Sequence, residues 1–350
     1  MFNKKGNIIY LEEDITYEEP YIDLNPISNP NLKYLKEIFN PDEDSFVDFL
    51  IRNLMKTVSN SKNNNIILTH WLEEYFEWKN SRDITDESKD IVTGTKVISK
   101  ITTGNIKSLL QLSFDVYCLQ IQRCFPNQLR NRLQLIDQFQ GAKYEIAVAS
   151  LLLRAGFTIK YDDPEISNIE GKSCEFVAIH RVTNDKIGIE AKSKKYRGVL
   201  NSPGGKNVDE IKDNFMGGLL SKAKKQRPSQ LPFIIFLDSN LPPSENLHLG
   251  EITYFDELSN LIKGDYDSYI NSKRQTPYND IIITNFSDHY LGSDFAPENV
   301  SFCTFHSEYP LYNINGGDRI YTDLINSLKN YTKGINLVTN KILREKSKLY

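Results

Sequence analysis

Apolar residues recur at helical spacing through the first part of the chain. Phe46, Phe49 and Leu50 begin one such series, and comparable series follow it. Apolar side chains three or four residues apart lie on one face of a helix. The pattern predicts a helical region over residues 31–139, which we expect to serve target recognition, oligomerisation or partner docking. Residues 1–30 combine prolines with clustered acids, and we expect an irregular arm there.

The pattern changes at about residue 140. A predicted helix over residues 141–155 is followed by short apolar runs that turn residues separate, as is typical of strands. These runs cover residues 157–161, 174–180, 186–192, 233–237, 280–284 and 300–305. A helix is predicted over 208–226. Strands mixed with helices predict an α/β (α+β) domain over 140–310, with a mixed sheet flanked by helices. Residues 311–350 are predicted to form a C-terminal helix and a basic tail.

The third predicted strand carries an acid and a lysine on one face. Successive side chains of a strand point to opposite faces, so Glu190 and Lys192 lie side by side. The alternate positions hold the apolar residues Ile187, Ile189 and Ala191. An acid and a lysine two residues apart on a strand can point at one small volume.

Two further acids are predicted to approach this pair. Glu175 begins the preceding strand, and the polar turn of residues 183–185 favours antiparallel pairing that brings Glu175 near Glu190. Glu145 shares a helix face with apolar residues at the following turns, so it points inward. A buried carboxylate is unfavourable unless a cation or hydrogen bonds compensate it. Three converging carboxylates would supply hard oxygen ligands for Mg²⁺ or Mn²⁺.

Each position also has a purely structural interpretation. Glu190 and Lys192 can form a solvated strand face with a salt bridge to a neighbour. Glu175 can be an exposed acid at a strand start, and Glu145 can be a first-turn acid that the helix dipole favours. It is their combination that favours a site.

The order of these elements resembles the PD-(D/E)xK nuclease superfamily, which has the restriction-endonuclease-like fold, and within it the Mrr-like and Holliday-junction-resolvase-like branches. The segment Glu190-Ala191-Lys192 matches the (D/E)xK element. Glu175 matches the position of the metal-binding Asp, and Glu145 matches the helical Glu of many members. The resemblance covers about residues 140–240, with weaker support to about residue 306.

This resemblance implies metal-dependent hydrolysis of phosphodiester bonds by an endonuclease. One or two Mg²⁺ ions (or Mn²⁺) would be held by Glu175, Glu190, the Ala191 carbonyl and Glu145, and the metal would lower the pKa of a bound water. Lys192 would orient that water or help to deprotonate it. The chain departs from the family in having Glu175 where an Asp is usual, which leaves reduced activity open.

The surrounding sequence is basic. Residues 186–227 contain 11 Lys or Arg against 4 Asp or Glu, an excess of seven positive charges, whereas the whole chain carries a net charge of -4. A basic stretch beside a metal site suits a phosphate backbone, although it can also be a solvated face. The residues predicted to bind nucleic acid are Lys194, Lys195, Arg197, Lys222, Lys225 and Gln226. Of these, Lys222 and Gln226 are the ones that the resemblance carries toward the active site.

These observations predict a DNA-cleaving enzyme of phage defence, restriction or repair. A catalytically reduced or partner-gated subunit that binds nucleic acid or a partner protein stays open, as does an RNA-directed nuclease or toxin. Expected partners are DNA, a second copy of the chain and a helicase, ATPase or other defence subunit, since the sequence has no phosphate-binding loop of its own. Without a leader segment or an apolar run of about 18 residues, we expect a cytoplasmic protein with no membrane partner. The four cysteines are scattered, so we expect them to be reduced and expect no zinc site.

Overall fold

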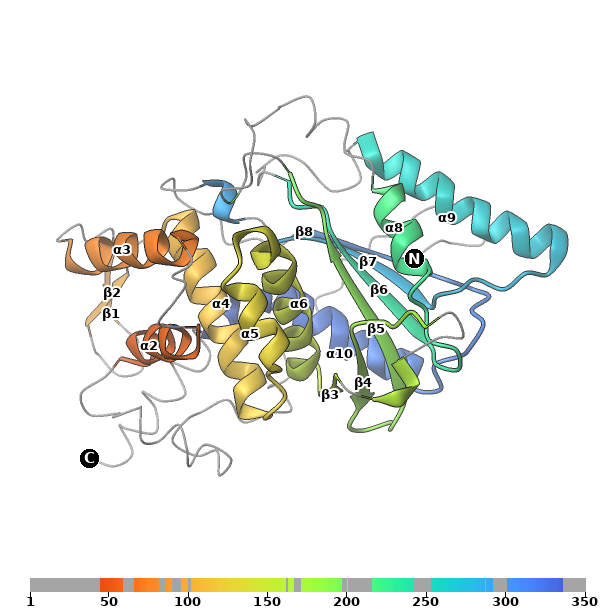
Figure 1. Ribbon diagram of the computed structural model, residues 1–350, viewed down its shortest axis with the longest axis horizontal. Helices are drawn as coiled ribbons and strands as arrows, with labels where there is room; N and C mark the ends of the chain where they lie inside the picture. Colours follow the sequence, from red (N-terminus) through yellow and green to blue (C-terminus); the bar gives the residue numbers. More distant parts are fainter. Residues whose placement is uncertain are drawn as a thin grey trace.

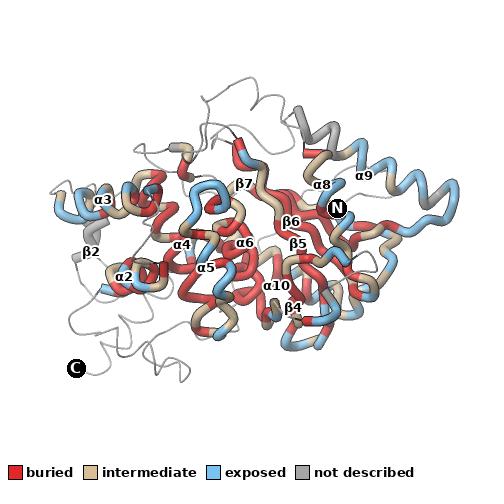
Figure 2. The backbone as a smooth tube through the Cα atoms, viewed as in Figure 1, coloured by how far each residue is buried: buried red, intermediate tan, exposed pale blue. Residues whose placement is uncertain are grey.

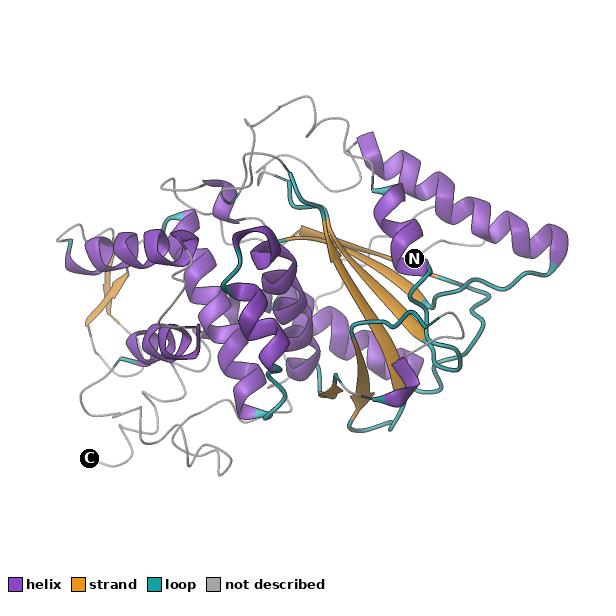
Figure 3. Ribbon diagram, viewed as in Figure 1, coloured by secondary structure: helices purple, strands orange, loops and turns teal. Residues whose placement is uncertain are grey.

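A mixed six-stranded sheet forms the centre of the computed structural model (Figures 1 and 3). The strands are β3 (Phe157–Lys160), β4 (Phe176–His180), β5 (Lys186–Ser193), β6 (Phe233–Asp238), β7 (Asp280–Asn285) and β8 (Ser301–His306). They lie in the order in which the chain makes them. The strand pairs β5–β6 and β6–β7 are parallel, and the other three pairs are antiparallel. The predicted mixed α/β class and all six predicted strands are confirmed.

The structure describes residues 45–58, 66–81, 86–89, 96–99, 102–161, 163–166, 171–196, 200, 216–241, 253–286, 288–291 and 301–335. The predicted N-terminal arm and most of the predicted basic tail lie outside these residues.

Helices cover both faces of the sheet (Figure 1). One face packs against α6 (Ile136–Arg154) and α10 (Gly317–Lys329), and the other packs against α8 (Gly217–Lys224) and α9 (Thr253–Ser272). The alternation of β6 explains this arrangement. Ile234 and Phe236 belong to the core on the α6 side, whereas Ile235 and Leu237 belong to the core on the α8 side. Every residue of β6 is therefore buried, as Figure 2 shows for the centre of the sheet.

The helical region packs directly on this sheet domain. It contains α2 (Phe46–Val58), α3 (Ile66–Asn80), α4 (Gly104–Ile121) and α5 (Asn127–Leu133). The hydrophobic core on the α6 side runs without interruption from α2 through α4 and α6 into the sheet. Helix α6 begins at Ile136 and thus crosses the boundary expected at residue 140, and it ends before Gly156, whose φ of 87° suits glycine.

Of the helix expected over residues 208–226, only 216–226 lie within the described residues, and there α8 runs over Gly217–Lys224. Two elements were not predicted. The helical region contains a two-stranded hairpin, β1 (Asp86–Lys89) with β2 (Lys96–Ser99). The 20-residue helix α9 was also not predicted, although its apolar residues Phe255, Leu258 and Ile262 recur at helical spacing.

The C-terminal helix is fixed to the sheet domain by buried polar contacts. Arg154, at the end of α6, donates to the Tyr331 carbonyl at 2.8 Å and to the Asn330 carbonyl at 2.6 Å. On α10, the Asp323 carboxylate lies 3.2 Å from Nε2 of the buried His180 of β4. Because these groups compensate one another away from solvent, they hold α10 in one register.

Candidate active site

The register of β4 and β5 brings the two predicted acids together. Phe176 lies opposite Ile189 in the antiparallel ladder, so the next step along each strand is Glu175 on one side and Glu190 on the other. The Glu175 backbone N–H donates to the Ile189 carbonyl at 2.9 Å, which extends the pairing beyond β4. Residues that face each other in a ladder share a face of the sheet, so the two carboxylates are neighbours.

Lys192 links both carboxylates. Its Nζ lies 2.9 Å from Glu175 Oε1 and also forms an ion pair with Glu190 Oε1. The ammonium thus stands where positive charge is needed to offset two adjacent acids. Burial opposes the charged form of Lys192, but the Glu190 and Glu175 carboxylates outweigh that effect and raise its pKa. Lys192 is therefore a cation at neutral pH.

Glu190 is the most buried member of the site, with no solvent exposure. Neither of its oxygens accepts a hydrogen bond of good geometry from the described residues; the ion pair with Lys192 is its compensation there. Burial raises the pKa of Glu190 to about 8, the Glu175 charge adds to this, and the Lys192 charge opposes it. A buried carboxylate with so little hydrogen bonding is costly in a metal-free protein. Coordination of a cation would satisfy it.

Glu145 is buried as predicted, but its partner is a residue that sequence reasoning missed. Arg132 of α5 donates from Nη1 to Glu145 Oε2 at 2.5 Å. Burial raises the pKa of Glu145 to about 7, and the nearby Glu175 carboxylate raises it further, whereas Arg132 lowers it. The structure therefore brings Glu145 into the electrostatic field of the site and gives it a guanidinium of its own.

Tyr161 is a second residue that the sequence did not single out. It follows β3, and its ring packs on Phe176 with centroids 5.2 Å apart. Its buried hydroxyl has no hydrogen-bond partner among the described residues. Burial raises its pKa well above the ordinary value, and the Glu145 and Glu175 charges act in the same direction. The phenol is thus a hydrogen-bond donor that faces the acidic site.

The carboxylates of Glu175 and Glu190 are suitable ligands for a divalent cation, although the described residues do not form a complete metal-binding site. Among the described residues, no three His, Cys, Asp or Glu side chains converge in a way that could hold a metal ion. Glu175 and Glu190 supply two adjacent carboxylates, and among the described residues Lys192 is the group that compensates Glu190. Ala191 lies between Glu190 and Lys192 on β5 and pairs with Phe236 of β6. Such hard oxygen donors suit Mg²⁺ or Mn²⁺.

A polar network fixes the end of β5 just beyond Lys192. Gln140 of α6 donates to Ser193 Oγ at 2.8 Å and to the Lys194 carbonyl at 2.5 Å. Ser193 in turn donates to the buried Asp238, at the end of β6, at 2.8 Å. Burial raises the pKa of Asp238, and three hydrogen bonds, from Ser193 and two backbone N–H groups, oppose this. The network holds the strand that carries Glu190 and Lys192.

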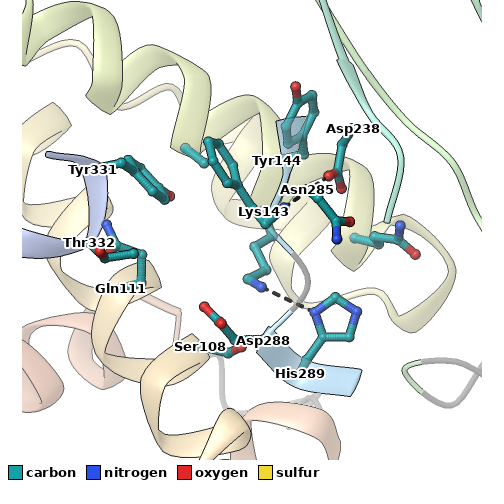
Figure 4. A pocket seen from close by; sticks show the side chains of 13 residues that line it. Ser108, Gln111, Lys143, Tyr144, Asp238, Asn285, Asp288, His289, Tyr331 and Thr332 are labelled. Atoms are coloured by element: carbon teal, nitrogen blue, oxygen red, sulfur yellow. Dashed lines mark hydrogen bonds between the residues drawn. The ribbon is translucent and has the colours of Figure 1, made fainter. Parts of the chain in front are cut away.

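This network borders a small cavity between α4, α6 and the ends of β6 and β7 (Figure 4). Its volume is about 30 Å³, which holds about two water molecules. Lys143 points into it, with Nζ 3.5 Å from Nδ1 of His289. Burial lowers the pKa of Lys143, and three nearby aspartates oppose that effect.

The predicted nucleic-acid-binding residues fall into two groups, one directly after β5 and one at the end of α8. Lys194 and Lys195 follow β5 directly, and the exposed Lys195 donates to the Asp137 carbonyl at 2.8 Å. Lys222 and Lys225 are exposed on and just after α8, and Gln226 follows them half-buried. Nothing in the described contacts joins Lys222 or Gln226 to Glu190 or Lys192. Arg197 lies outside the described residues.

Just upstream of Glu175, the sequence offers Asp162 and Asp163 as an alternative pair of metal ligands or, more simply, as part of a turn before Pro164. Asp163 accepts from the Glu165 backbone N–H at 2.9 Å and so caps the short turn Pro164–Ile166. This is the turn interpretation of that pair. Asp162 lies outside the described residues.

Comparison with known proteins adds no family to these observations. No family model, no curated protein and no solved structure matches the chain. Within the described residues, no helix has both the length and the apolar character that crossing a membrane requires.

Proposed function

We propose that the protein is a metal-dependent nuclease that hydrolyses phosphodiester bonds, with DNA as its substrate. The single observation that carries this proposal is the pairing of Glu175 with the fully buried Glu190, whose compensation among the described residues is the Lys192 ammonium that it shares with Glu175. Two carboxylates and a lysine on neighbouring strands are the groups that metal-assisted phosphoryl chemistry uses. A strand face built only for stability would not need to bury an acid in this way.

The order of elements supports the same proposal. Helix α6 precedes the antiparallel strands β3, β4 and β5, and α8 then leads to β6, which is parallel to β5. This is the order in which the resemblance to PD-(D/E)xK nucleases places the helical Glu, the first acid and the ExK strand. The site lies where β4 begins and β5 approaches its end, so both acids lie on adjacent interior strands.

Each side chain has a part in the proposed reaction. Glu175 and Glu190, with the Ala191 carbonyl, would hold one Mg²⁺ or Mn²⁺ ion. When bound, such an ion supplies an acidified water and neutralises charge on the phosphate. Lys192 orients the attacking water and stabilises the negative charge that develops on the phosphate oxygens. Lys194, Lys195, Lys222 and Lys225 would contact the backbone phosphates on either side.

The test is a cleavage assay on the full chain. Supercoiled plasmid, single-stranded DNA and RNA are incubated with Mg²⁺, Mn²⁺ or EDTA. Glu190→Gln and Lys192→Met should each lower the rate at least a hundredfold, the scale on which loss of one such electrostatic group acts. The matched control is Lys186→Met, because Lys186 lies on the same strand but pairs with the exposed Glu165 at 2.6 Å. Cutting that survives in both site variants would place the chemistry elsewhere, and preferential cutting of RNA would change the substrate class.

A second candidate function rests on the same ion pairs. Lys192 contacts both carboxylates, so each already has a cationic partner without a metal. Together with Glu175 in place of Asp, this favours a reduced or partner-gated nuclease-fold subunit. Such a subunit would bind DNA without cutting it, and binding would survive in Glu190→Gln. The same assay, read beside a DNA-binding titration, distinguishes the two functions.

The proposed biological setting is phage defence, restriction or repair. A homodimer would allow two sites to cut both strands of a duplex. An associated helicase or ATPase would supply the motor activity for which this chain has no phosphate-binding loop. Sedimentation at several protein concentrations tests the dimer.

A further inference from the structure

The helical region contributes one charged side chain directly to the candidate site. Arg132 belongs to α5, where its neighbours Leu129 and Leu133 are buried in the core shared with α6. These two anchors fix the orientation of the helix and aim Arg132 at α6. Its guanidinium lies 2.5 Å from Glu145, whose side chain is only 4% exposed. The region for which the sequence predicted only recognition or docking thus reaches the acidic cluster.

The local sequence makes room for this contact. Gly141 lies one turn before Glu145 on α6, and a Cβ atom there would stand 3.3 Å from Nη2 of Arg132. That distance is tighter than ordinary van der Waals contact, so a larger residue would press on the guanidinium. Glycine in a helix interior costs about 1 kcal/mol relative to alanine. Its presence here is accounted for by the space that the arginine needs.

The pair decides what Glu145 can bind. A carboxylate that accepts a charge-assisted hydrogen bond from arginine in a partly buried setting exchanges that partner only for a stronger one. Glu145 is otherwise a third acid in the electrostatic field of Glu175, and a second cation bound to Glu145 would offset that added negative charge. Arg132 supplies a positive charge to Glu145 instead.

We infer that Arg132 takes the place of a second metal ion, so that the candidate active site holds one divalent cation, between Glu175 and Glu190, and Glu145 is not a ligand. This inference rests on the proposed function, since it concerns the metal of that site. It assigns Arg132 a role in setting the metal stoichiometry. Removal of the guanidinium should convert Glu145 from a bystander into a ligand.

Calorimetric titration of the full chain with Mn²⁺ tests the inference without relying on activity. The wild type should bind one ion, and Glu190→Gln should lower the affinity for that ion at least about tenfold. Glu145→Gln, made in the wild type, should leave both the ion number and the affinity unchanged. Arg132→Met should bind two ions, and the double variant Arg132→Met with Glu145→Gln should bind one again.

The possible results separate the inference from the function on which it rests. Two ions in the wild type, fewer or weaker ions in Glu145→Gln, or a single ion in Arg132→Met would each overturn the role of Arg132. The Glu145→Gln titration decides the matter even if Arg132→Met does not fold. A wild type with no Glu190-dependent ion would instead contradict the metal site itself. A single Glu190-dependent ion that Glu145→Gln leaves intact supports both.

Discussion

Nζ of Lys192 lies 2.9 Å from Oε1 of Glu175, a residue on the neighbouring strand and 17 positions earlier in the chain. The same ammonium forms an ion pair with the buried Glu190. One cation therefore compensates two carboxylates that the antiparallel register places side by side. The charge balance of the metal-free site depends on this lysine, because neither Glu190 oxygen has another donor among the described residues.

Replacement of Lys192 by Met should destabilise the metal-free protein by about 3 kcal/mol, since it leaves a buried acid without its cation. The loss should be larger at pH 9 than at pH 6, because Glu190, with a pKa of about 8, is largely protonated at the lower pH. Urea denaturation at both pH values measures it. Lys195→Met is the control, because Lys195 is exposed and contacts only a backbone carbonyl in the described structure, so a change within about 0.5 kcal/mol is expected. Equal losses in the two variants would contradict the assigned charge balance.

The local part of this arrangement could be predicted from the sequence. The six strands follow from short apolar runs between turn residues, and the turn over residues 183–185 sets the pairing of β4 with β5. Period-two alternation then places Glu190 and Lys192 on one face. The strands, their pairing and the shared face of Glu190 and Lys192 all depend on residues close together in the chain. The spacing of apolar and polar residues is therefore enough to predict them.

The missed features depend on contacts between distant elements. Arg132 meets Glu145 because α5 packs against α6, and nothing within either helix signals the pair except the small residue Gly141. Tyr161 faces the acids only because β3 lies beside β4. The pattern of residues within one helix or strand does not show which distant element packs against it, so these contacts could not be predicted from the sequence.

The stability of the metal-free protein should fall as pH rises from about 5 to 8. Glu190 and Glu145 have folded-state pKa values of about 8 and about 7, both above the ordinary value of 4.5. Between those limits the unfolded chain has already lost these protons while the folded chain keeps them, so each rise in pH favours unfolding. The slope is at most about 1.4 kcal/mol per pH unit for each group.

Urea denaturation in EDTA at pH 5, 6, 7 and 8 measures this slope. Glu190→Gln should make it shallower, because the amide does not titrate. A slope that is the same in the wild type and in Glu190→Gln would show that the Glu190 carboxyl ionises normally in the folded protein.

Tyr161→Phe should not destabilise the metal-free protein, and a gain of about 1 kcal/mol is expected. The Tyr161 hydroxyl is buried and has no hydrogen-bond partner among the described residues, so its removal relieves a desolvation cost and breaks none of their hydrogen bonds. Tyr331→Phe is the matched comparison, since the Tyr331 hydroxyl donates to the buried Asp115 at 2.6 Å and its loss should cost about 1–3 kcal/mol. Thermal unfolding of both variants provides the measurement. A loss in Tyr161→Phe as large as that in Tyr331→Phe would mean that the Tyr161 hydroxyl has a partner in solution.

Gly188→Ala should destabilise the protein by about 1–3 kcal/mol, the usual cost of forcing an extra methyl group into a packed core. Gly188 lies in β5 two residues before Glu190, and a Cβ atom there would stand 2.6 Å from Cγ of Pro228 and 3.3 Å from Sγ of Cys174. The strand would have to shift, and Glu190 and Lys192 would move with it. Metal-dependent cleavage should therefore fall more than stability alone explains, measured at a temperature where the variant is folded.

Gly264→Ala provides the opposite control. Gly264 is an exposed residue inside α9, and a Cβ atom added there meets nothing within 4 Å. Alanine is favoured over glycine in a helix interior by about 0.8–1 kcal/mol, so this variant should be slightly more stable than the wild type, with unchanged cleavage. Denaturant midpoints of the two variants, measured side by side, test the close packing behind β5. If Gly188→Ala is as stable as Gly264→Ala, Pro228 does not pack against the strand that carries Glu190 and Lys192.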